Sequence, residues 1–75
     1  MDLNQTDAAL ELARRAVSLE PGASYHRVTL ARVLSSLSKR DEALKEAERA
    51  LALARDAAER QRAENMVEYL KRQSR

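Results

Sequence analysis

Apolar residues recur along this chain at intervals of three and four positions, the spacing that gathers side chains on one face of an α-helix. The first such stripe predicts a helix over residues 7–19. Asn4 or Thr6 can cap its beginning, and Pro21 with Gly22 ends it, because proline disfavours helical geometry in the residue before it. The stripe of this first helix comprises Leu10, Ala13, Ala16 and Val17.

Residues 24–54 contain two further stripes, which are separated by a polar run at positions 38–40. They predict a helix over about 24–37, capped by Ser24, and another over about 41–54, opened by Asp41. A fourth stripe predicts a helix over residues 57–73, with no glycine or proline before it. The third and fourth helices could therefore be separate or fused.

Two observations favour a turn near residues 55–57. A heptad started at Leu44 keeps apolar residues as far as Ala58 and meets only polar residues after it. Asp56 followed by Glu59 also matches a capping box with Asp in place of Ser. We therefore predict one all-α domain, residues 1–75, with about four helices.

Composition agrees with this fold and narrows the function. The chain has 14 Lys and Arg against 12 Asp and Glu, and the two signs alternate along the helices. Interleaved charges form solvated helix faces, whereas nucleic acid requires a stripe of positive charge, so we do not expect nucleic-acid binding. The absence of cysteine, of a signal peptide and of an apolar run of roughly 20 residues predicts a cytoplasmic protein without a membrane segment.

Residues able to support catalysis are scarce. His26 is the single histidine, there is one glycine, and no serine lies in a nucleophile-elbow motif. A histidine metal pair and a glycine-rich phosphate loop are both excluded. We expect no enzyme activity, no metal site and no cofactor, and we expect His26 to be a surface or partly packed residue.

The chain also repeats itself. Residues 41–55 match residues 7–21 at seven of fifteen positions, an interval of thirty-four residues. Five of the identical pairs are apolar and lie at helical spacing. The first members of these five pairs are Ala9, Leu10, Ala13, Ala16 and Leu19, and each partner lies thirty-four residues later.

A thirty-four-residue interval filled by helix, turn and helix resembles the tetratricopeptide repeat. Ala43, Ala47 and Ala50 stand where this family has small residues at close helix crossings, and Pro21 stands at the closing proline. Alanine at a crossing lets two helix axes approach to about 8 Å. The resemblance implies antiparallel helix-turn-helix repeats of a right-handed α-solenoid.

The match is partial. The first helix of the full repeat lacks the family's aromatic residues, Ser38 replaces the turn glycine, and Arg55 replaces the second closing proline. Residues 57–73 repeat the pattern of the helix over 24–37 at an interval of thirty-six, so they could begin another repeat or form the capping helix that closes such arrays. The implied organisation is half a repeat (7–19), one full repeat (24–54) and a capping helix (57–73).

In this family the first helices line a groove that holds an extended peptide or a partner helix. Carried over to this chain, the resemblance predicts a protein-binding stripe on the exposed side of the helix over 24–37, formed by Tyr25, Val28, Arg32, Ser35 and Ser36. The capping helix would add Gln61, Glu64, Glu68 and Lys71.

A second hypothesis is a structural or engineered fragment that self-assembles and has no ligand of its own. The first predicted helix lacks the partner that a complete repeat would supply. Solenoids also generally need about three repeats for stability. We therefore expect either a segment of a longer array or a homo-oligomer. The uncovered face is predicted to contain Leu10, Leu12 and Val17.

Overall fold

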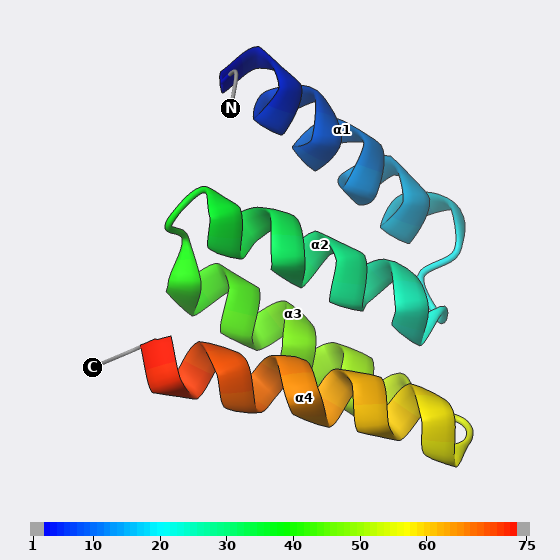
Figure 1. The fold of residues 1–75 in the computed structure, drawn as a ribbon. Coiled ribbons are helices and arrows are strands. Elements are labelled where there is room, and N and C mark those ends of the chain that lie inside the picture. Colours follow the sequence, from blue (N-terminus) through cyan, green and yellow to red (C-terminus); the bar gives the residue numbers. More distant parts are fainter. Residues whose placement is uncertain (1–2, 74–75) are drawn as a thin grey trace.

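The computed structural model describes residues 3–73, and within that range the chain forms four α-helices and no strand. They are α1 (Leu3–Leu19), α2 (Ser24–Ser36), α3 (Arg40–Leu53) and α4 (Ala57–Gln73). Successive helices run in opposite directions, so that α2 and α4 point the same way (Figure 1). The prediction of an all-α chain with four helices is confirmed.

The third and fourth helices are separate. Asp56 Oδ1 accepts a 2.8 Å hydrogen bond from the Glu59 N–H, and Glu59 Oε1 accepts a 3.0 Å bond from the Arg55 N–H. The predicted capping box therefore exists, although Glu59 reaches one residue further back than is usual. It satisfies N–H groups at the start of α4, whose bounds are the predicted ones.

Two predicted N-caps are wrong. Helix α1 begins at Leu3, so Asn4 and Thr6 lie within it. Ser24 is the first residue of α2, and the N-cap is Ala23, which makes no side-chain cap bond. The Ser24 hydroxyl is instead buried and donates a 2.8 Å hydrogen bond to the carbonyl of Ala50 in α3.

That bond satisfies a carbonyl at the end of α3. The N–H of Ala54, four residues after Ala50, bonds to the carbonyl of Leu51. The Ala50 carbonyl belongs to the last turn, where helices lack their own donors. Ser24 therefore joins the beginning of α2 to the end of α3.

The turn between α2 and α3 is a Schellman motif. The Lys39 N–H bonds to the Leu34 carbonyl at 2.9 Å, and the Ser38 N–H bonds to the Ser35 carbonyl at 3.0 Å. Ser38 has a φ of 62°, the left-handed conformation that glycine usually supplies. Ser38 thus occupies, with a Cβ, the position that glycine usually takes in this motif.

Helix α2 lies at the centre and packs against the other three helices, whereas α1 packs closely against α2 alone (Figure 1). The molecule is a slab of 35 × 33 × 16 Å, so its core is thin. Half of the buried apolar residues are alanines, which is what close helix crossings require. The buried apolar residues are Ala13, Val28, Leu30, Ala31, Leu34, Ala43, Ala47, Ala50, Ala63, Met66, Val67 and Leu70.

Candidate functional site

A groove of about 400 Å³ lies between α2 and α4. Since the two helices run in the same direction, residues three and four positions apart on each helix form its two walls. The lining residues are Arg32, Ser35 and Ser36 from α2, and Met66, Tyr69 and Gln73 from α4. Three of the five residues predicted for a binding stripe therefore line one groove.

The groove combines an apolar base with polar walls. Met66 is buried, whereas Tyr69 and Arg32 are exposed. Arg32 is the one charged residue among those that line the groove. The Ser36 hydroxyl donates a 3.2 Å hydrogen bond to the Arg32 carbonyl. The exposed polar side chains of the lining are Arg32, Ser36, Tyr69 and Gln73, and Arg32 and Tyr69 are the largest of them.

Tyr25 lies outside this lining, nearer the beginning of α2. Its side chain is exposed, and the Arg62 guanidinium carbon lies 5.6 Å from the centroid of its ring. That is the geometry of a cation–π contact. It places Arg62 of α4 against α2, as a second cation in addition to Arg32. The His26 ring lies 5.8 Å from the Tyr25 ring, and His26 Nε2 is 2.8 Å from Glu20 Oε1. The expected partly packed environment of His26 is confirmed.

Val28 was predicted to be exposed on the stripe, and this is wrong. Its exposed fraction is 2%, and it belongs to the core. Helix α4 packs against α2, so the apolar side of the stripe faces protein and only the side that bears Arg32 and Ser36 faces solvent.

The residues expected from the capping helix do not line the groove either. Gln61, Glu64, Glu68 and Lys71 are all exposed elsewhere on α4. Burial of Met66 and Leu70 turns the neighbouring positions of Tyr69 and Gln73 toward α2. The spacing of Met66, Tyr69 and Gln73, three and four residues apart, is the sequence signal that could have found this wall.

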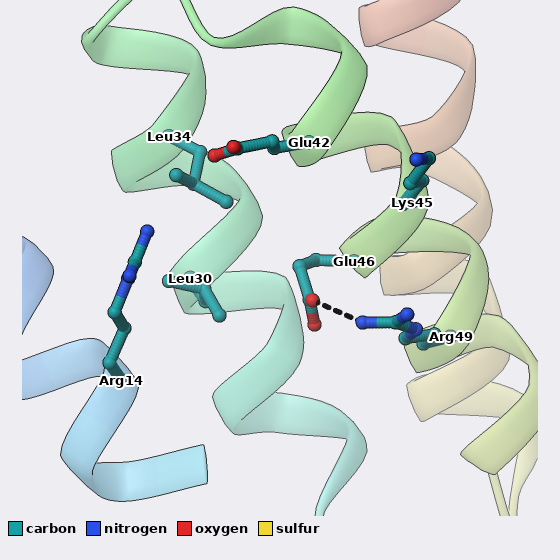
Figure 2. A pocket seen from close by; sticks show the side chains of 7 residues that line it. All are labelled: Arg14, Leu30, Leu34, Glu42, Lys45, Glu46 and Arg49. Carbon is teal, nitrogen blue, oxygen red and sulfur yellow. Dashed lines mark hydrogen bonds and ion pairs between the residues drawn. The ribbon is translucent and has the colours of Figure 1, made fainter.

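A second hollow, of about 330 Å³, lies over α2 between α1 and α3. Figure 2 shows Arg14 of α1 on one side of Leu30 and Leu34, and the charged residues of α3 on the other. The full lining is Arg14, Leu30, Leu34, Glu42, Lys45, Glu46 and Arg49.

A charge network forms the α3 side of this hollow. Glu46 accepts a 2.8 Å bond from Arg27 and a 2.7 Å bond from Arg49, the second of which is drawn in Figure 2. The Glu46 and Arg27 side chains are only 14% and 17% exposed. Arg27 also donates to the Pro21 carbonyl at 3.3 Å. Glu46 therefore has two cationic partners, and the network joins α2 to α3.

The expected self-association face is not one surface. Leu10 and Val17 are half-buried and pack against the core, whereas Leu12 is 65% exposed. Leu10 and Val17 face α2 because they belong to the stripe that the first helix needs for its own packing.

Comparison of the chain with protein-family models, with curated proteins and with solved structures finds no match. Among the described residues, no helix is long and apolar enough to cross a membrane. In the same residues, no three histidine, aspartate or glutamate side chains gather as a metal site would require. The class that the structure defines is thus an all-α domain of four helices with a polar groove between α2 and α4.

Proposed function

We propose that this chain is a protein-interaction module of the tetratricopeptide type, which binds an extended acidic peptide in the groove between α2 and α4. The observation that carries the proposal is the groove itself, whose two walls present Arg32 and Tyr69 above an apolar base. Arginine and tyrosine are enriched among the residues that contribute most to protein interfaces.

Burial patterns support a repeat organisation. Ala13 in α1 and Ala47 in α3, thirty-four residues apart, are both buried, and Leu10 and Leu44 are both half-buried beside the core. The interval of thirty-six residues between α2 and α4 relates three further pairs in which both members are buried. These pairs are Leu30 with Met66, Ala31 with Val67, and Leu34 with Leu70. Equivalent packing positions are what a right-handed α-solenoid requires.

The charge of the groove indicates the ligand. Its lining contains a guanidinium and no carboxylate, and Arg62 adds a second cation beside Tyr25. A guanidinium binds a carboxylate through two parallel hydrogen bonds, which favours Asp, Glu or a chain terminus in the ligand. Arg62 lies beside Tyr25 near the beginning of α2, and Gln73 ends α4, so a peptide running along both helices would pass both residues.

Selection from a random peptide library displayed on phage tests the proposal. We expect the chain to enrich acidic sequences, and we expect Arg32→Glu to reduce the affinity of a selected peptide by tenfold or more, on the order of a lost charge-assisted contact. Tyr69→Ala should also weaken binding. Arg60→Glu is the matched control, because Arg60 is an exposed arginine of α4 outside the groove.

Two results would refute the proposed function. One is the absence of any enriched peptide, which would favour the structural-fragment hypothesis. The other is a selected peptide whose affinity falls equally in Arg32→Glu and Arg60→Glu, because that would show a general charge effect.

A further inference from the structure

Helix α1 bears a second apolar stripe beside the one that packs against α2. Leu12 and Leu19 are 65% and 76% exposed, and Ala9 and Ala16 lie between and beside them at intervals of three and four residues. This spacing places the four side chains along one line of the helix. Helix α1 packs closely against α2 alone; Ala9 and Ala16 are half-buried, whereas Leu12 and Leu19 are exposed.

The equivalent line of α3 is a packing surface. Ala43 and Ala50, which correspond to Ala9 and Ala16, are completely buried. Glu46, which corresponds to Leu12, contacts Arg27 of α2. The equivalent positions of α1 therefore have residues suited to a helix contact: Ala9 and Ala16 are unchanged, and Leu12 replaces the charged Glu46.

The order of large and small residues indicates the occupant. The stripe reads Ala9, Leu12, Ala16, Leu19, and it is centred on position 14. An identical helix laid against it in the antiparallel direction pairs Ala9 with Leu19, and Leu12 with Ala16. Every layer then contains one large and one small side chain, which fills the space evenly. A parallel copy would instead alternate crowded leucine layers with loose alanine layers.

The charges beside the stripe fit the same arrangement. Glu11 and Arg15 are both exposed and lie on the same flank of the stripe. In an antiparallel copy about a two-fold axis equal flanks lie together, so Glu11 of each chain comes toward Arg15 of the other. In a parallel copy each flank faces the opposite flank of the partner, so this charge pairing is lost. Opposite charges across an interface favour one orientation over the other.

We propose that a second copy of this chain binds along this stripe of α1, through an antiparallel α1–α1 contact about a two-fold axis near position 14. The contact is modest, since the stripe spans roughly 15 Å of helix. One helix pair of this length buries less surface than the roughly 1,200 Å² of a standard stable interface. The dimer is therefore expected to dissociate in the micromolar range. None of its residues lines the α2–α4 groove, so it does not depend on the proposed function.

Sedimentation equilibrium of the 75-residue chain between about 5 μM and 1 mM tests for the dimer. We expect concentration-dependent dimerisation, and we expect Leu12→Glu to weaken it by about a hundredfold or more, because both copies lose a buried leucine. Ala52→Glu, at an exposed position of α3, is the matched control and should change nothing. Far-UV circular dichroism checks that both variants remain folded. A monomer at 1 mM, or equal dimers in Leu12→Glu and the parent chain, would overturn the proposal.

Cysteine crosslinking tests the direction of the contact, since the chain has no cysteine of its own. A mixture of Leu12→Cys and Ala16→Cys chains should oxidise mainly to the mixed dimer. Faster oxidation of Leu12→Cys with itself would show a parallel pair and would refute the antiparallel arrangement. If the face is covered by a different protein in a larger assembly, neither crosslink will exceed that of an Ala52→Cys control, and the proposal fails.

Discussion

Replacing Ser38 by glycine should stabilise this fold. Ser38 is in the left-handed region, with a φ of 62°, at the position of the Schellman motif where glycine is preferred. The left-handed conformation costs a residue with a Cβ roughly 1–2 kcal/mol, and glycine adopts it without that cost. The substitution therefore removes strain at the turn between α2 and α3.

The gain is partly offset in the unfolded chain. Glycine loses more backbone freedom on folding than serine, a penalty of about 0.5–1 kcal/mol. The net stabilisation is then about 0.5–1 kcal/mol. For a chain of this size, 1 kcal/mol corresponds to a rise in Tm of about 4–8 °C, so Ser38→Gly should raise Tm by about 2–8 °C.

Thermal and urea unfolding followed by circular dichroism measure this effect. Ser38→Ala is the matched control for loss of the hydroxyl, and it should not stabilise the fold, because alanine keeps the Cβ. Gly22 supplies the converse test: its φ is not positive, and an added Cβ would meet Arg55 at an ordinary 3.7 Å. Gly22→Ala should therefore stabilise by about 0.4–1 kcal/mol. The reasoning is refuted if Ser38→Gly lowers Tm, or if Ser38→Ala raises it equally.

Two further predictions concern contacts between α2 and α3. A double-mutant cycle for Arg27 and Glu46 should give a coupling free energy of about 1 kcal/mol or more. The cycle for Arg49 and Glu46 should give about 0.5 kcal/mol or less, because Arg49 is 60% exposed and Arg27 is 17% exposed. Equal coupling free energies would contradict the role assigned to burial. Ser24→Ala should destabilise by about 1–2 kcal/mol in urea unfolding, because it leaves a buried carbonyl of α3 without its donor. Ser36→Ala, which loses a bond at an exposed position, is its control and should stay within about 0.5 kcal/mol.

The candidate groove could be predicted only in part from the sequence. The family resemblance, together with helical spacing, placed Arg32, Ser35 and Ser36 on one side of a helix, and all three line the groove. The same spacing included Val28, because a helical stripe does not reveal where the neighbouring helix begins to cover it. The wall from α4 was missed for a related reason: which side of an amphipathic helix faces its neighbour depends on how the two helices pack.

Local sequence features were enough to predict the four helices and the breaks between them. Apolar periodicity, the Pro21–Gly22 pair and the Asp56–Glu59 capping box act within a few residues of each other, so their effect can be read locally. What the ends and faces of those helices contact depends on the packing of the whole domain. The Ser24 hydroxyl bonds to a carbonyl twenty-six residues away, and Glu46 pairs with an arginine nineteen residues away. Such partners depend on how α2 and α3 pack together, and no interval in the sequence specifies that packing.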